Sequence, residues 1–209
     1  MRKIAPGRKR LLNNTITYAM VIIAFVVLQI LNAGGVLSPS LQGQLVPICA
    51  YVTMAISLNL VVGISGELSL GHAGFMSVGA FSGVVANLSL QSAISSGPLR
   101  LLVSMVIGAV LAGVAGTIVG VPVLRLRGDY LAIVTLAFGE IIKNIINILY
   151  IGVDENGLHF STQNEMALDL AEGGISILKG PMGVTTNLKL SSFTAGFILV
   201  LVALTVVLN

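Results

Sequence analysis

The chain has 209 residues, of which 56% are hydrophobic and only 9% are charged. Because a soluble domain carries about 25% charged residues, this composition, with a mean hydropathy of +1.00, indicates a membrane protein. The formal net charge is +3, and the single cysteine, Cys49, excludes an internal disulfide and a cysteine metal cluster.

The N-terminus is strongly basic. A basic segment directly before an apolar run is typical of a cytoplasmic anchor rather than of a nucleic-acid-binding tail. We therefore expect residues 1–15 to form a basic cytoplasmic N-terminus, with no nucleic-acid partner. A cleaved signal peptide is the alternative, but residues 16–31 are long for its apolar segment and no small-residue cleavage site follows. Five of the eleven basic residues lie in the first ten positions: Arg2, Lys3, Arg8, Lys9 and Arg10.

Six apolar segments follow one another along the chain, and each is expected to form a transmembrane helix. The predicted fold is all-α, a polytopic integral membrane helix bundle in which residues 16–209 form a single transmembrane domain. An external loop is expected at residues 152–190. The expected spans are residues 16–31, 45–62, 73–90, 101–124, 129–151 and 193–208.

A glycine-rich break, SLNLVVGISGELSLGHAGFMSVGAF at residues 57–81, separates the second and third spans. In hydrocarbon an unpaired backbone N–H or C=O is costly, so a non-helical turn at membrane depth must be buried by protein or wetted by water. A broken helix with polar side chains is typical of a transport pathway. The candidate translocation-path residues here are Gly63, Gly66, Glu67, Ser69, Gly71 and His72.

Small residues recur at intervals of four along the third and fourth spans. Residues four apart share one face of a helix, and small ones let two helix backbones approach closely. We therefore expect close helix packing at Gly79, Gly83, Gly108, Ala112, Gly116 and Gly120.

The fifth span carries Glu140, Lys143, Asn144 and Asn147 in an otherwise apolar run. Glu140 lies eleven residues after Asp129, or about 16 Å at helical rise, which places it near the middle of the membrane. Charges at that depth are costly unless they pair or face water, and spacings of three and four place these side chains on one face. We interpret all four as translocation-path residues; a structural ion pair is the alternative.

The distribution of Lys and Arg predicts the orientation. With the N-terminus in the cytoplasm and alternating sides, seven Lys and Arg lie inside and three outside, which fits the positive-inside rule. Arg125, Arg127 and Asp129 are then expected in a cytoplasmic turn. The external loop holds five of the eight acidic residues, and we interpret it either as a cap for an extracellular partner or as a solvated loop without one.

No pattern in the sequence indicates catalysis. His72 and His159 fall on opposite sides of the expected bilayer and cannot share a metal ion. The glycine break lacks the Lys-Ser/Thr ending of a phosphate-binding loop. We therefore expect no catalytic residue, no metal site and no cofactor bound by this chain.

Two long blocks of the sequence resemble the permease subunits of branched-chain amino-acid ABC importers, specifically the LivM-type subunit. The blocks are NLVVGISGELSLGHAGFMSVGAF at residues 59–81 and VPVLRLRGDYLAIVTLAFGEIIKNII at residues 121–146. Gly180, Met182 and Gly183 fit a short glycine-bearing turn of that family. Two departures are Glu67, where many relatives carry Gln, and Lys143, where many carry Arg.

The resemblance implies a transporter subunit, not an enzyme, that moves Leu, Ile or Val across the cytoplasmic membrane of a prokaryote. It implies three kinds of partner in or at the lipid bilayer: a second, LivH-like permease, two ATP-binding cassette ATPases that bind the ATP, and an extracytoplasmic amino-acid-binding protein. Relatives continue into a basic cytoplasmic loop and further spans, so we expect a permease domain that is incomplete at its C-terminus. The alternatives are a permease for urea or another small solute, an ATPase-independent channel or secondary transporter, and a non-transporting structural membrane subunit.

Overall fold

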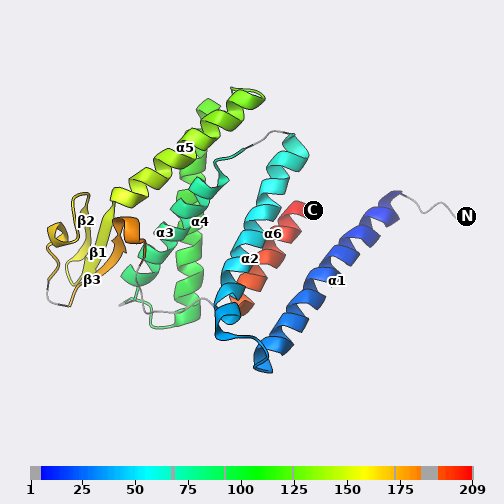
Figure 1. The fold of residues 1–209 in the computed structure, drawn as a ribbon, viewed down its shortest axis with the longest axis horizontal. Coiled ribbons are helices and arrows are strands. Elements are labelled where there is room, and N and C mark those ends of the chain that lie inside the picture. The colour runs from blue at the N-terminus through cyan, green and yellow to red at the C-terminus, as the bar shows by residue number, and fades with distance from the viewer. Residues whose placement is uncertain are drawn as a thin grey trace, which may run out of the picture. The chain divides into compact units, whose positions relative to one another are not determined.

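The computed structural model describes residues 6–66, 69–91, 93–123, 125–171, 173–184 and 193–208, and Figure 1 shows their fold. Two compact units are present, one made of Met1–Ser57 with Ser192–Asn209 and one made of Leu58–Ser191. The first unit contains α1 (Pro6–Ala33), most of α2 (Pro39–Asn59) and α6 (Phe193–Leu208). The second unit contains η1 (Leu60–Ser65), α3 (His72–Ser89), α4 (Gly97–Val123), α5 (Asp129–Ile148) and a small sheet.

All six predicted spans correspond to helices, which confirms the polytopic helical class. Four helical segments of the described chain are long and apolar enough to cross a membrane: Asn14–Ala33, Pro39–Gly63, Gly97–Val123 and Asp129–Ile148. The apolar helix α6 is shorter, at 16 residues, and α3 is not among the four. The total of six spans therefore stays a prediction.

Aromatic and small residues hold the first unit together. The ring of Phe25 in α1 stacks on the rings of Phe193 and Phe197 in α6, with centroid separations of 5.0 and 3.8 Å. Gly196 of α6 lies so close to α2 that an added Cβ would be 2.9 Å from the Cβ of Cys49. The absence of a side chain at Gly196 thus permits the approach of α6 to α2.

The predicted break after the second span begins with a change of helix type. The α-helix α2 ends at Asn59 and continues as the π-helix η1, which ends at Gly66 with a φ of 69°. Glycine adopts this left-handed conformation without the steric cost that a Cβ brings, so it commonly ends helices. Residues 69–71 form no regular secondary structure before α3 begins at His72. Glu67 lies outside the described residues.

Helices α3 and α4 approach each other through small residues. A Cβ added to Gly108 of α4 would lie 2.5 Å from the backbone oxygen of Gly79 and 3.4 Å from the Cα of Gly83. The Cβ of Ala112 would be 3.3 Å from a Cβ added to Gly79. Four of the six small residues singled out in the sequence therefore lie at this helix crossing.

The spacing of small residues continues along α4 beyond the crossing. A Cβ added to Gly116 or Gly120 would meet no atom of the described chain within 4 Å. Within the described residues, these two glycines therefore make no close helix contact, in contrast to the expectation from their spacing.

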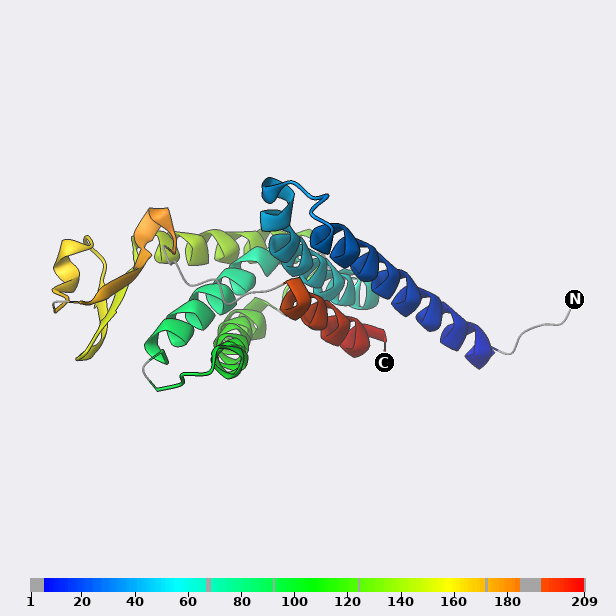
Figure 2. The same ribbon diagram turned by 90° about the horizontal axis from the view of Figure 1, so that it is seen from below.

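A three-stranded antiparallel sheet follows α5, in the order β2-β1-β3. Its strands are β1 (Tyr150–Asp154), β2 (Gly157–Ser161) and β3 (Ile175–Lys179), and Figures 1 and 2 both show it at the C-terminal end of α5. The sequence predicts a helix as far as Ile151 and a loop from residue 152, which is wrong in detail. Ile151 is instead a strand residue, paired with Phe160 and Leu178, and it is buried.

Two short helical turns complete the region around the sheet: η2 (Met166–Leu168) and η3 (Gly180–Met182). The sheet has its own apolar core, in which Ile177 and Leu178 are at most 1% exposed and Leu168 is 2% exposed. The predicted external loop is thus largely a folded module.

Candidate functional site

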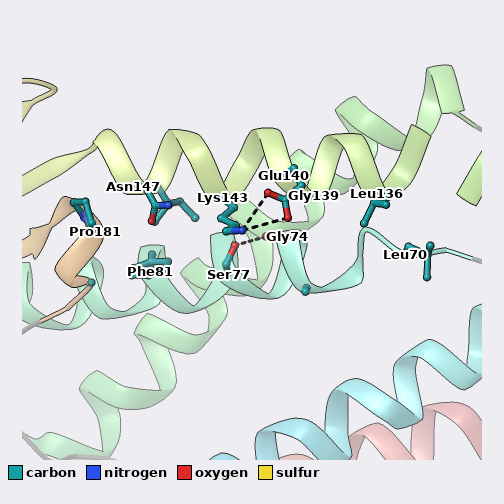
Figure 3. Close-up of a pocket in the computed structure, with 14 residues that line it drawn as sticks. Leu70, Gly74, Ser77, Phe81, Leu136, Gly139, Glu140, Lys143, Asn147 and Pro181 are labelled. Atoms are coloured by element: carbon teal, nitrogen blue, oxygen red, sulfur yellow. Dashed lines mark hydrogen bonds and ion pairs between the residues drawn. The ribbon is translucent and has the colours of Figure 1, made fainter. Parts of the chain in front are cut away.

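A groove of about 430 Å³ lies between α3 and α5 and is closed at one end by η3 (Figure 3). Pockets that hold small molecules have volumes of about 300–1,000 Å³, so the groove is large enough for a small solute. The residues that line it are Leu70, Ala73, Gly74, Ser77, Phe81, Leu136, Gly139, Glu140, Lys143, Ile146, Asn147, Gly180, Pro181 and Gly183.

An ion pair occupies the α5 wall of the groove. The ammonium nitrogen of Lys143 lies 3.2 and 3.3 Å from the two carboxylate oxygens of Glu140. Both side chains point into the groove in Figure 3, and they are 63% and 57% exposed. An exposed pair of this kind contributes only about 0.2–1 kcal/mol to stability in water, whereas charges in hydrocarbon must meet water or protein. Stability alone therefore does not account for two charges on this face.

Small residues permit the close approach of α3 and the segment before it to α5 beside the groove. A Cβ added to Gly71 would lie 2.5 Å from the backbone oxygen of Thr135, and one added to Gly74 would lie 3.0 Å from the Cα of Gly139. At both positions a larger side chain would first meet backbone, which cannot give way as a flexible side chain can. The shape of the groove thus depends on Gly71, directly before α3, and on Gly74 in its first turn.

Thr135 ties the break between the second and third spans to α5. Its hydroxyl oxygen accepts a hydrogen bond from the backbone N–H of Leu70 at 3.1 Å and donates one to the carbonyl of Ala132 at 2.9 Å. Leu70 precedes α3, so its N–H has no partner within a helix. The buried side chain of Thr135 supplies that partner.

We expect Thr135→Val to destabilise the protein by about 1–3 kcal/mol, because it keeps the shape of the side chain but leaves the N–H of Leu70 unpaired. The measurement is the thermal unfolding midpoint of the purified protein. Thr117→Val is the matched control, since Thr117 is exposed on α4 and bonds only the carbonyl of Gly113 in its own helix. Equal effects of the two substitutions would contradict the role given to Thr135.

The turn at η3 closes the groove because Gly180 fits against the end of α5. Gly180 has a φ of 54°, and a Cβ there would lie 2.8 Å from the backbone oxygen of Asn147. The N–H of Gly180 donates to the carbonyl of Leu149 at 3.2 Å. The glycine-bearing turn noted in the sequence therefore forms the end wall of the groove.

The structure brings three of the four translocation-path candidates on α5 to the groove. Glu140, Lys143 and Asn147 line it, whereas Asn144 is exposed and is not among the lining residues. On the α3 side, Ser77 lines the groove and its hydroxyl donates to the carbonyl of Gly74 at 2.6 Å.

The other path candidates lie along the break and at the start of α3. Gly63 belongs to η1 and Gly66 ends it, while Ser69 is half-buried in the segment that follows. Gly71 is buried against Thr135. His72 is the first residue of α3, and its Nδ1 is buried without a hydrogen-bond partner in the described part of the chain.

Three residues proposed for a cytoplasmic turn are found just before or at the start of α5. Arg125, Arg127 and Asp129 are all exposed there. Gly128, with a φ of 60°, allows the chain to turn into the helix.

Sequence reasoning missed most of the residues that shape the groove. Ser77, Phe81 and Gly139 were not chosen, because a lone hydroxyl, aromatic or glycine in an apolar run also fits a lipid-facing or packing position. Only Gly139, directly before a charged residue in an apolar run, carried a usable signal. The contact partner of Gly71, Thr135, lies more than sixty residues away in the chain.

The sheet β2-β1-β3 and the loops around it, which we call the sheet module, contain a carboxylate that holds two loops by backbone hydrogen bonds. Asp154 accepts backbone hydrogen bonds from Asn156 at 2.8 Å, Gly157 at 3.1 Å and Ala171 at 3.1 Å. His159 Nε2 lies 3.1 Å from the same carboxylate. The hydrogen bond from Ala171, followed by those from Asn156 and His159, lowers the pKa of Asp154 below its usual value of 3.8.

We expect acidic pH to lower the stability of this module. Because the pKa of Asp154 is lower in the folded protein than in the unfolded one, its contribution to stability is present above the usual pKa of 3.8 and is lost as the pH falls through the folded value. Amide hydrogen exchange over residues 150–171, corrected for intrinsic rates, measures this. Asp154→Asn should exchange faster than wild type at neutral pH and depend less on acid, whereas Glu155→Gln, on the same exposed turn, should behave like wild type.

The fold and the groove together define a multi-pass helical membrane protein with a charged groove between two of its helices. Residues 40–209, most of the chain, match the family described as "Branched-chain amino acid transport system / permease component". The chain belongs to this family, which confirms the predicted permease class rather than an enzyme.

Two curated relatives are similar to part of the chain, and both are named "High-affinity branched-chain amino acid transport system permease protein LivM". The relative from Escherichia coli is 43% identical over 96 residues, and the relative from Salmonella typhimurium is 44% identical over 100 residues. Each match covers 46% of this chain and 21% of the relative, so it spans about a fifth of the relative's length. No solved structure matches the chain significantly.

Proposed function

We propose that the chain is a permease subunit of an ABC importer that moves branched-chain amino acids across the cytoplasmic membrane of a prokaryote. In this proposal the α3–α5 groove is one wall of the translocation path. The observation that carries it is the Glu140–Lys143 pair, which faces a groove of solute size in a member of a permease family.

The exposure of the two charged side chains in the groove supports a translocation path that is shared with a second subunit. Glu140 and Lys143 are more than half exposed, although they lie on an apolar helix long enough to cross a membrane. Charges in that position require water or a protein partner beside them. A second, LivH-like permease subunit that faces the groove across a water-filled path meets this requirement.

The remaining partners follow from the class of transporter. Two ATP-binding cassette ATPases bind and hydrolyse the ATP, so this chain binds no cofactor itself. With the N-terminus in the cytoplasm, as the basic residues indicate, Arg125, Arg127 and Asp129 face the ATPases. The sheet module and η3 then lie on the outside, where an extracytoplasmic amino-acid-binding protein delivers its ligand next to the groove.

Reconstitution of the chain with these partners in vesicles tests the proposal. Radiolabelled leucine should accumulate only with ATP and the binding protein present, and unlabelled isoleucine and valine should compete whereas urea should not. Uptake that ignores ATP would indicate a channel or secondary transporter. Uptake of urea in place of leucine would indicate the small-solute alternative.

A further inference from the structure

The groove combines one cation and one anion with apolar walls. Glu140 and Lys143 are the only ionisable side chains among its described lining residues, and they lie one helical turn apart. Phe81, Leu136 and Ile146 supply apolar surface to the same groove. The described lining is therefore neutral overall but strongly polarised at one point.

We infer that this ion pair binds the two charged backbone groups of a free α-amino acid, with the substrate carboxylate on Lys143 and the substrate ammonium on Glu140. The inference rests on the proposed function, since it takes the groove to hold the substrate. The two charged groups of an α-amino acid are bonded to one carbon. They therefore match a cation and an anion whose nearest atoms are 3.2 Å apart.

Binding of the amino acid to Lys143 and Glu140 leaves no charge without a partner. In the structure Lys143 and Glu140 neutralise each other. A zwitterion inserted between them replaces that one ion pair by two, and the charge-assisted hydrogen bonds of such pairs are the stronger class of hydrogen bond. An amino acid with a charged side chain adds a net charge that the neutral groove does not compensate, so the site selects against it.

The apolar walls complete the selection. An aliphatic side chain held by its backbone groups at the ion pair lies next to Phe81, Leu136 and Ile146. Each methylene buried there raises the affinity by about fourfold. The groove walls therefore suit the aliphatic side chain of the amino acids named in the proposed function, while the ion pair binds their backbone groups.

The experiment measures binding of radiolabelled leucine to the purified permease complex without the extracytoplasmic binding protein. The competitors are leucine, isoamylamine, which lacks the carboxylate, and isocaproate, which lacks the ammonium group. Each single-charge analogue should compete at least about tenfold more weakly than leucine, because each loses one charge-assisted contact.

Two single variants then assign the contacts. Lys143→Gln should remove most of the preference for leucine over isoamylamine but keep the preference over isocaproate, and Glu140→Gln should do the reverse. The double variant, Glu140→Gln with Lys143→Gln, should bind the three ligands with similar affinity. It leaves no unpaired charge, so it tests the inference even if a single variant fails to assemble. Ile133→Ala, exposed on the same helix but outside the groove lining, is the control and should retain the wild-type ratios.

Unchanged ratios in all variants, or equal weakening of all three ligands, would overturn the inference, as would a wild-type complex that binds the analogues as tightly as leucine. ATP-driven leucine uptake by the wild-type complex is measured in parallel. If that uptake is present while the ratios do not respond, the ion pair is not the recognition site and the proposed function stands. If the wild-type complex takes up no leucine, the proposed function itself fails.

Discussion

Gly71→Ala is expected to destabilise the protein by about 1–3 kcal/mol and to reduce leucine uptake roughly tenfold or more. The added Cβ would lie 2.5 Å from the backbone oxygen of Thr135. Because that atom is part of a helix backbone, α3 must move away from α5, and the groove between them must change shape. Thermal unfolding of the purified protein and ATP-driven uptake in vesicles measure the two effects.

The matched control for Gly71 is Gly139, which faces it from α5. A Cβ added to Gly139 would lie 3.5 Å from the Cα of Gly71, which is an ordinary contact. Gly139→Ala should therefore leave uptake within about twofold of wild type and should not lower stability, since alanine favours the helix over glycine. Equal losses in the two variants would show that the close approach of Gly71 to α5 does not determine the shape of the groove.

Gly108→Leu should prevent the second unit from folding stably, because its Cβ would lie 2.5 Å from the backbone oxygen of Gly79. The leucine side chain cannot be accommodated unless α3 and α4 separate, and overpacking of this kind costs about 1–3 kcal/mol or more. The expected result is loss of the monodisperse protein in size-exclusion chromatography after detergent extraction.

Gly116 gives the comparison on the same helix. A Cβ there would meet no described atom within 4 Å, so Gly116→Leu should be extracted at the wild-type level. If Gly116→Leu fails as badly as Gly108→Leu, the small residues of α4 form one continuous contact surface, and the limited α3–α4 crossing described above is wrong.

The helices could be predicted from the sequence because apolar runs of membrane length have few alternative structures. Phe193–Leu208 was predicted to the residue, and the other helices begin or end within a few residues of the predicted bounds except at the start of α1 and α2. The break at Gly66 was also predictable, because glycines and polar residues in an apolar run oppose a continuous helix.

The sheet was not predicted, although its hairpin turn contains the sequence Asn156-Gly157, a common turn signal. Its strands are only five residues long, and Gly152 and Gly157 interrupt the apolar alternation on which strand prediction depends. The stability of the sheet comes from residues such as Ile177 and Leu178, which are buried by tertiary contacts that no local pattern reveals.

Only some of the residues of the groove could be predicted from the sequence. Charges in an apolar helix are rare and costly, so Glu140 and Lys143 could be chosen from the sequence alone. Ser77, Phe81 and Thr135 could not, because their roles depend on which face of α3 meets which face of α5. That pairing is decided by glycines whose contact partners lie far away in the sequence.

The central claim is that the α3–α5 groove is a wetted wall of the translocation path, and the reactivity of a cysteine at Ser77 tests it most directly. Ser77→Cys and Ile133→Cys are compared in a Cys49→Ser background, within the full transporter complex in membranes. Ser77 lines the groove, whereas Ile133 is an exposed apolar residue of α5 outside the groove lining. Because a membrane-impermeant, hydrophilic thiol reagent needs water to react, we expect it to label Ser77→Cys but not Ile133→Cys, and leucine with ATP to change the labelling rate. Equal labelling at both positions, or no labelling at Ser77→Cys in an actively transporting complex, would contradict the account.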